Sequence, residues 1–86
     1  MIKCRYGIPG HEREWVIIID GFNLENYIPH SISNDLQTNI PESAVLNRGS
    51  RVEIITNDDS EDMKRRILNI IENTFSEKPW VEEMRQ

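Results

Sequence analysis

The chain has 86 residues, 37% of them hydrophobic and 29% charged, and its net charge at pH 7 is −5. A chain of this length forms one domain with a modest hydrophobic core, so we expect residues 1–86 to be a single small domain. The excess of acids disfavours non-specific nucleic-acid binding, because such binding grows with the number of phosphates that Lys and Arg neutralise.

The cysteine count and the hydropathy pattern bear on the compartment. Cys4 is the single cysteine, which excludes an intramolecular disulfide and favours a reducing environment. No apolar run approaches the roughly 20 residues that a membrane span requires. We therefore predict a cytoplasmic protein that does not use a membrane as a partner.

The first 20 residues carry two strand signals. Apolar residues alternate along residues 2–8 and share one face: Ile2, Cys4, Tyr6 and Ile8. This period of two predicts a half-buried strand, which Pro9 and Gly10 interrupt. The continuous apolar run Trp15–Ile19 predicts a second strand that is buried on both faces. Residues 1–20 are therefore expected to form an antiparallel β-hairpin.

Residues 21–50 carry the weakest pattern, and we expect an irregular segment with a short helix. Three apolar residues fit one helical turn that ends before Pro29: Leu24, Tyr27 and Ile28. Three more recur at helical spacing further on: Ile32, Leu36 and Ile40. Residues 44–46 fit a brief strand.

Residues 51–76 predict a strand followed by a long helix. The strand covers residues 51–56, and Asp58 or Ser60 can then cap a helix that extends from about Asp59 to Phe75. The helix has one apolar stripe: Met63, Ile67, Ile70, Ile71, Thr74 and Phe75. It should end near Ser76 because Pro79 follows, and the tail, residues 77–86, fits one further helical turn.

These elements predict an α+β fold. Its sheet, mixed or antiparallel, contains three or four strands, built from the N-terminal hairpin and strand 51–56. The long C-terminal helix packs across one face of that sheet.

Catalytic and metal-binding signals are weak. Neither His11 nor His30 has a Cys or a second His at ligand spacing, and Cys4 lies on the apolar face of a strand. We therefore assign no catalytic residue, no metal site and no cofactor. The basic run of residues 64–66 is expected on a solvated helix face, with Arg66 paired to Asp62.

Charged residues and one tryptophan are the candidates for partner binding. Bases gather near the amino end at Lys3 and Arg5, whereas acids gather at Asp58, Asp59 and Asp62. A domain with oppositely charged ends suits a complementary partner, or a second copy that binds head to tail.

Trp80 lies in a charged tail, and tryptophan is enriched among interface hot spots. The alternative for this residue is that its ring folds back onto the end of the long helix near Phe75.

Two segments resemble parts of ubiquitin-like β-grasp interaction domains. Residues 46–56, where a turn at Gly49 precedes the strand, resemble the closing strand of the TGS domain. Residues 56–59 resemble the end of a Phox-and-Bem homology domain, whose first strand carries a basic residue where Lys3 or Arg5 lies here. The resemblance implies a protein-interaction module that uses faces of opposite charge.

The segment Ile19–Leu24 resembles the end of the first strand in PIN-like nucleases of the NYN type. This second resemblance implies that Asp20 binds a divalent metal, with Asp58, Asp59 or Asp62 as further ligands.

The function we predict is a non-enzymatic protein–protein interaction or oligomerisation module with charge-complementary faces. The alternatives are a metal-dependent PIN/NYN-like nuclease fragment and a small acidic inhibitor that mimics nucleic acid. Bases interrupt the acids along the chain, which weighs against the mimic.

Overall fold

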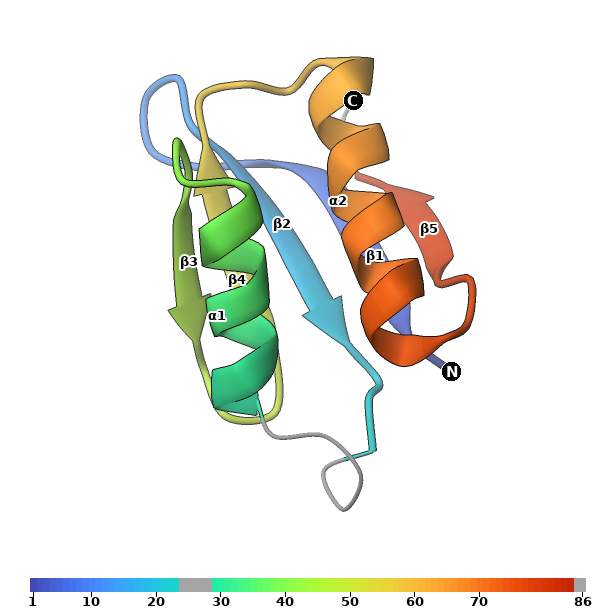
Figure 1. The fold of residues 1–86 in the computed structure, drawn as a ribbon. Coiled ribbons are helices and arrows are strands. Elements are labelled where there is room, and N and C mark those ends of the chain that lie inside the picture. The colour runs from blue at the N-terminus through green and yellow to red at the C-terminus, as the bar shows by residue number, and fades with distance from the viewer. Residues whose placement is uncertain (24–28, 85–86) are drawn as a thin grey trace.

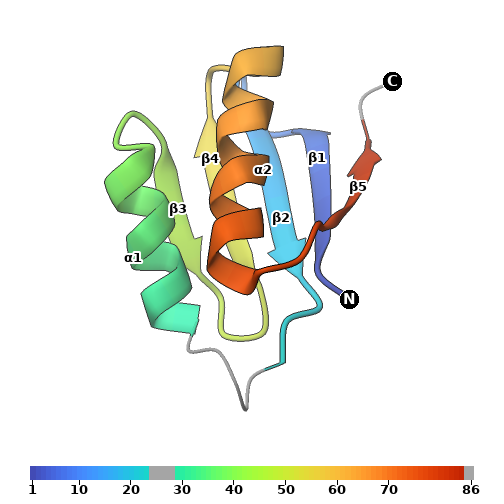
Figure 2. The same ribbon diagram turned by 45° about the vertical axis from the view of Figure 1, so that its right-hand side comes forward.

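The computed structural model describes residues 1–23 and 29–84, which form one five-stranded sheet and two helices. The elements in chain order are β1 (Lys3–Pro9), β2 (Trp15–Asp20), α1 (Pro29–Asn39), β3 (Ala44–Asn47), β4 (Val52–Thr56), α2 (Glu61–Phe75) and β5 (Trp80–Glu83). The strand order is β3-β4-β2-β1-β5, and neighbours are antiparallel except for β1 and β5, which are parallel. Both helices cover the same face of the sheet (Figures 1 and 2). The α+β class is confirmed, with five strands where three or four were predicted.

The tail is the largest departure from the predicted elements, because it forms a strand and not a helical turn. The Trp80 N–H donates to the Ile2 carbonyl oxygen at 2.8 Å, and the Met84 N–H donates to the Tyr6 carbonyl oxygen at 2.7 Å. A single isolated helical turn is unstable in water, whereas β1 supplies a row of backbone partners. The edge of β1 therefore decides the structure of the tail.

A bulge changes which residues of β1 face the helices. Arg5 pairs with Ile18, but Ile8 pairs with Val16, so β1 holds one extra residue. Gly7 has a φ of +79°, the left-handed conformation that such a bulge requires. The residues before it keep the predicted alternation, but Ile8 moves to the opposite face and is half-buried. The prediction that Ile8 shares a face with Tyr6 is therefore wrong.

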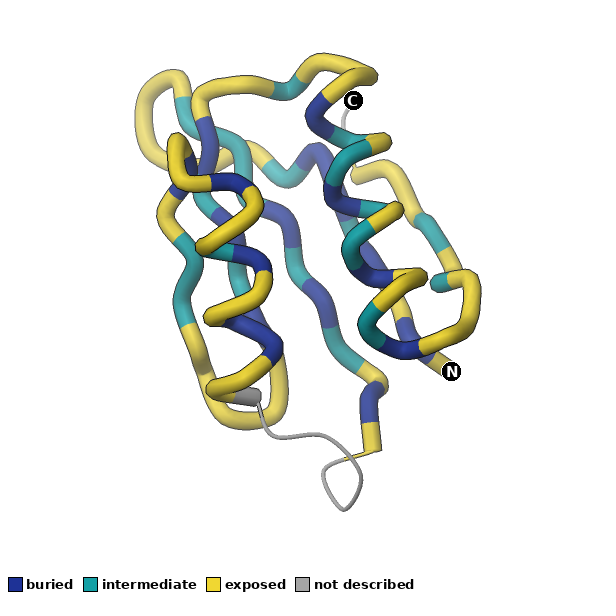
Figure 3. The backbone as a smooth tube through the Cα atoms, viewed as in Figure 1, coloured by how far each residue is buried: buried dark blue, intermediate teal, exposed yellow. Residues whose placement is uncertain are grey.

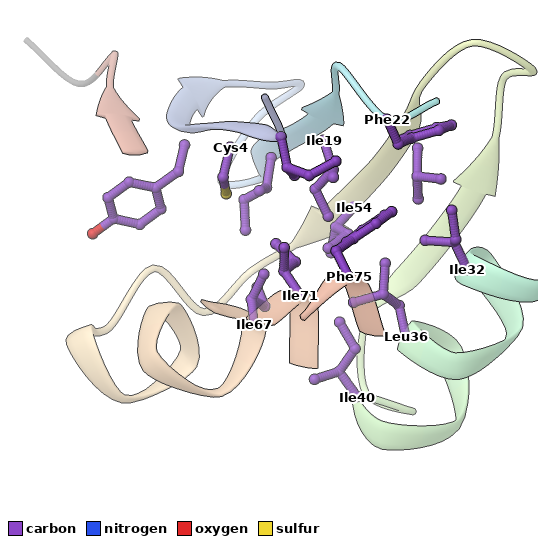
Figure 4. Close-up of a cluster of buried hydrophobic side chains, with 14 of the residues drawn as sticks. Cys4, Ile19, Phe22, Ile32, Leu36, Ile40, Ile54, Ile67, Ile71 and Phe75 are labelled. Atoms are coloured by element: carbon purple, nitrogen blue, oxygen red, sulfur yellow. The ribbon is translucent and has the colours of Figure 1, made fainter. Parts of the chain in front are cut away.

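The hydrophobic core lies between the sheet and the two helices. The apolar stripe of α2 supplies four buried residues: Met63, Ile67, Ile71 and Phe75. Figure 4 shows Ile19 and Ile54 of the sheet pointing toward side chains of α2 and α1. Phe22, which follows β2, stacks on Phe75 with ring centroids 5.8 Å apart. The two aromatic rings close the core at the carboxyl end of α2.

Helix α1 is longer than the short helix expected within residues 21–50. Ile32, Leu36 and the following Ile40 are buried, as their helical spacing predicts. Gln37 ties α1 to β3, since its Nε2 donates to the Ser43 carbonyl oxygen and its Oε1 accepts from the Val45 N–H. The turn predicted for Leu24, Tyr27 and Ile28 lies outside the described residues.

Ser60 caps α2, which settles the choice between Ser60 and Asp58. The Met63 N–H donates to the Ser60 Oγ at 3.2 Å, while the Asp58 Oδ1 accepts from the Ser60 N–H at 2.9 Å. The helix thus begins at Glu61, two residues after the predicted start. It ends where Ser76 adopts a left-handed φ of 58°, as expected from the nearby Pro79.

Arg66 does not pair with Asp62. Its guanidinium reaches from α2 to the segment after α1, where it binds the Glu42 carboxylate and the Asn39 carbonyl oxygen. Asp62 is paired instead with Arg65, at 3.5 Å. A helix-surface rule cannot foresee this pairing, because the partners lie outside α2, at the end of α1 and in the segment that follows it.

Among residues 1–23 and 29–84, no helix combines the length and the apolar character needed to cross a membrane.

Candidate functional site

One face of the sheet has no helix over it within residues 1–23 and 29–84, and we call it the open face. The strands turn their alternate residues toward the helices, which leaves the intervening residues on the open face. One row of paired residues crosses all five strands: Leu46, Glu53, Ile18, Arg5 and Glu82. A second row crosses three strands: Asp20, Lys3 and Trp80.

Strand β2 explains why the open face is partly apolar. Ile17 and Ile19 are buried under the helices, while Val16 and Ile18 are half-buried on the open face. The expectation that β2 is buried on both faces is therefore wrong. The residue opposite Val16 on β4, Ile55, is half-buried too, so the centre of the open face is a small apolar surface.

Trp80 lies at the edge of this face and is 56% exposed. It is the register partner of Lys3, so the indole ring and the ammonium group lie on neighbouring strands. Phe75, against which the ring was alternatively expected to pack, lies on the helix-covered side and stacks on Phe22. The tail places Trp80 on the surface because β5 pairs with β1.

Charges surround Trp80 on the open face. The Arg5 Nη2 and the Asp20 Oδ2 are 2.6 Å apart, with 37% and 26% of the two side chains exposed. Within residues 1–23 and 29–84, neither Lys3 nor Glu82 forms an ion pair. The face therefore presents one unpaired base and one unpaired acid beside the indole ring.

A shallow groove of about 540 Å³ joins these residues. It is lined by Lys3, Arg5, Asp20, Gly21, Ser50 and Glu82. The volume lies in the range of small-molecule pockets, but such pockets are mostly apolar and enclosed. A polar groove that opens to solvent suits the surface of another protein better.

The acids Asp58, Asp59 and Asp62 lie far from Asp20. Strands β2 and β4 are antiparallel, with Trp15 paired to Thr56 at one end and Ile19 paired to Val52 at the other. Asp20 follows Ile19, whereas Asp58 follows Thr56, so the two carboxylates lie at opposite ends of the sheet. The structure does not bring these acids together as a shared metal site.

In the part of the chain that the structure describes, no three His, Cys, Asp or Glu side chains gather closely enough to hold a metal ion. Asp20 forms an ion pair with Arg5, and Asp58 accepts a hydrogen bond from the Ser60 N–H in the loop before α2. Hydrogen bonds from Ser60 are the main cause that lowers the pKa of Asp58.

Cys4 is not placed to act as a nucleophile. It is buried between the sheet and α2, and this burial raises the pKa of its thiol to about 12. Since the thiolate is the reactive form, Cys4 behaves as a small core residue, as predicted from its strand position.

Glu82 and the half-buried residues of β2 are the members of the open face that sequence reasoning missed. Glu82 was placed in a helical tail, although Trp80 and Val81 favour strands and residues 80–83 permit a strand. For β2, a continuous apolar run does not reveal whether its second face is covered.

No protein-family model matches the chain, and no curated protein or solved structure shows significant similarity to it. The resemblance to β-grasp interaction domains therefore stays a prediction.

Proposed function

We propose that the chain is a non-enzymatic protein-interaction module that binds its partner through the open face of the sheet. The observation that carries this proposal is the position of Trp80, which is exposed beside Lys3 on the open face. Tryptophan provides a large contact area and is among the residues that most often dominate interface energies.

The composition of the open face supports this proposal. Val16, Ile18 and Ile55 offer apolar area at its centre, and a partner that covers them removes that area from water. Charged residues at the margin, Lys3 and Glu82 among them, steer and orient a partner of matching charge. An apolar centre with a polar rim is the usual arrangement of a protein interface.

The acids that precede and begin α2 extend the proposal to self-association. Asp58, Asp59 and Asp62 lie at the opposite end of the molecule from Lys3, as the strand register requires. One copy can therefore present its acids to the base of the next copy, which gives a head-to-tail contact. Arg5 contributes less than Lys3 to such a contact, because Asp20 neutralises it. With Cys4 as a buried free thiol, we assign the module to the cytoplasm.

The first test is the solution mass by light scattering at low and at high salt. A dimer or larger species that dissociates as salt rises is the result expected for self-association. The substitution Lys3→Glu should weaken it several-fold. Arg13→Glu, a matched charge reversal in the exposed loop between β1 and β2, should not weaken it, because this loop lies at the acidic end, which faces the base of the next copy.

A monomer at both salt concentrations would direct the test to a second protein. The immobilised chain is then used to capture partners, with the Trp80→Ala variant as the paired control. Association that survives both Lys3→Glu and Trp80→Ala would contradict the proposal.

A further inference from the structure

We infer that β5 accepts an extended segment of a partner protein as a sixth strand, and that this segment alternates basic and apolar residues. The inference rests on the proposed interaction function and names its partner class. It is built from three features of β5: its outer backbone edge, its side chains on the open face, and the groove on its helix side.

The first feature is the backbone edge. Strand β5 lies at the end of the sheet, beside β1 (Figures 1 and 2). Trp80 and Met84 direct their N–H groups to β1. Because successive residues of a strand direct their backbone groups to opposite sides, Val81 directs its N–H and C=O outward. An added strand can bind these two groups, as in β-augmentation.

The second feature is the pair of side chains that β5 places on the open face, Trp80 and Glu82. Both are exposed, and within residues 1–23 and 29–84 the Glu82 carboxylate has no ion-pair partner. A Lys or Arg on an added strand would lie opposite Glu82 at cross-strand distance. Its cationic group would also reach the face of the Trp80 ring. The open-face residues of the segment are therefore basic.

The third feature is a groove on the other side of β5, between this strand and α2. It measures about 460 Å³, and Leu68, Pro79 and Val81 give it an apolar floor. Helix α2 leaves β5 mostly exposed, as the burial pattern in Figure 3 shows. Three bases and two acids also line the groove: Lys64, Arg65, Lys78, Glu61 and Glu72. The helix-side residues of the segment are therefore apolar, since they would lie over this apolar floor.

A second copy of this chain is a poor occupant of the edge. Two β5 strands paired with each other would bring Glu82 and Glu83 of one copy against the same acids of the other. Like charges opposite each other destabilise strand pairing, and charged edge strands are a known protection against self-pairing. The net charge of −5 also favours a basic segment as the occupant of this edge.

The test is a titration of the whole chain with a short blocked peptide that alternates lysine and valine, followed by NMR of the protein amides. Binding should shift the Val81 amide and the Trp80 indole N–H. Two control peptides have the same amino-acid composition: one with its lysines contiguous, and one with N-methyl groups along both backbone edges. Both should bind at least tenfold more weakly, because the first loses the alternation and the second loses the hydrogen bonds.

Substitutions in the protein also test whether the peptide binds as an added strand. Val81→Pro removes the outward N–H without removing a bond to β1, and proline is tolerated in edge strands. It should abolish peptide binding, whereas Val81→Ala, which keeps the N–H, should retain most of it. Glu82→Gln should weaken binding about two- to fivefold, the size of one cross-strand ion pair, and Glu77→Gln should not.

Equal binding of the N-methylated and the unmodified peptide would overturn the inference, and this result needs no variant that might unfold. Failure of the inference is distinguishable from failure of the proposed function. If Trp80→Ala weakens partner binding but Val81→Pro does not, the open face is the interface and strand addition is wrong.

Discussion

At the scale of single residues, Gly21 shows that the Asp20-Gly21 pair has a structural role that does not require a metal-binding site. Its φ is +82°, and a β-carbon at this position would overlap the carbonyl oxygen of Met1. Only glycine fits a left-handed position with backbone so close. Asp20 meanwhile holds Arg5. Asp20 and Gly21, two residues of the Ile19–Leu24 segment that carried the resemblance to NYN nucleases, are thus accounted for by the end of β2 and its packing against the N-terminus.

Cys4 gives a prediction at the same scale. Its thiol has a pKa of about 12, chiefly because of burial, so roughly one molecule in ten thousand carries the thiolate at pH 8. We expect the native protein to react with Ellman's reagent at least a hundredfold more slowly than the urea-unfolded chain. Rapid reaction of the native protein, at the rate of the unfolded chain, would show that Cys4 is accessible and would contradict the packing of β1 against α2.

At the scale of elements, the cap of α2 is the most direct test of local structure. Ser60 accepts a hydrogen bond from the Met63 N–H, one of the donors that a helix start leaves without an intrahelical partner. Ser60→Ala should destabilise the protein by about 1 kcal/mol. In a chain of this size such a loss lowers the melting temperature by about 4–8 °C.

Ser50 supplies the matched control for the cap, because it is an exposed serine in the turn between β3 and β4. Ser50→Ala should change the melting temperature little. Equal effects of the two substitutions would mean that the Ser60 hydroxyl does not cap the helix. Circular dichroism during thermal unfolding measures both.

The elements that sequence predicts are those whose signal is local. The hairpin of β1 and β2, strand β4 and helix α2 follow from alternation or from helical spacing within one segment. Strand β5 was missed because its partners, Ile2 and Tyr6, lie at the other end of the chain. The displacement of Ile8 was missed for a related reason, since a bulge at Gly7 appears only when β1 is aligned with β2.

The candidate site was predictable in some of its members but not in its arrangement. Lys3, Arg5 and Trp80 were singled out separately, and the parallel pairing of β1 with β5 brings them together. Asp58, Asp59 and Asp62 were grouped with Asp20 as an alternative ligand set, which the antiparallel register of β2 and β4 separates. Residue type and local charge identify candidates, whereas strand order decides which of them can act together.

At the scale of the whole molecule, titrating groups set the pH range of stability. Glu53 lies between Arg48 and Arg51, and the hydrogen bond from Arg51 is the main cause that lowers its pKa below the ordinary 4.5. The pKa of Glu42 is lowered as well, first by a hydrogen bond from its own backbone and second by the Arg66 side chain. The pKa of Asp58 is lowered by hydrogen bonds from Ser60. At the alkaline end, burial raises the pKa of Cys4 from 9.0 to about 12.

These shifts predict a plateau of stability between about pH 5 and pH 9. A carboxyl group whose pKa is lower in the folded state stabilises that state above its unfolded pKa, so stability falls as acid protonates Glu42, Glu53 and Asp58 below about pH 4.5. A thiol whose pKa is higher in the folded state has the opposite effect, so stability falls as pH rises above 9.

Urea midpoints measured from pH 3 to pH 10 test the loss of stability at both the acid and the alkaline end. Cys4→Ala should remove the loss of stability above pH 9 and leave the loss below pH 4.5 unchanged. Glu53→Gln should reduce the loss below pH 4.5 and leave the loss above pH 9 unchanged. High salt should also weaken the contribution of Glu42 to this loss of stability in acid, because its ion pair with Arg66 is exposed and is screened by salt. A midpoint that rises below pH 4.5 would contradict the arrangement of ion pairs described for β4 and α2.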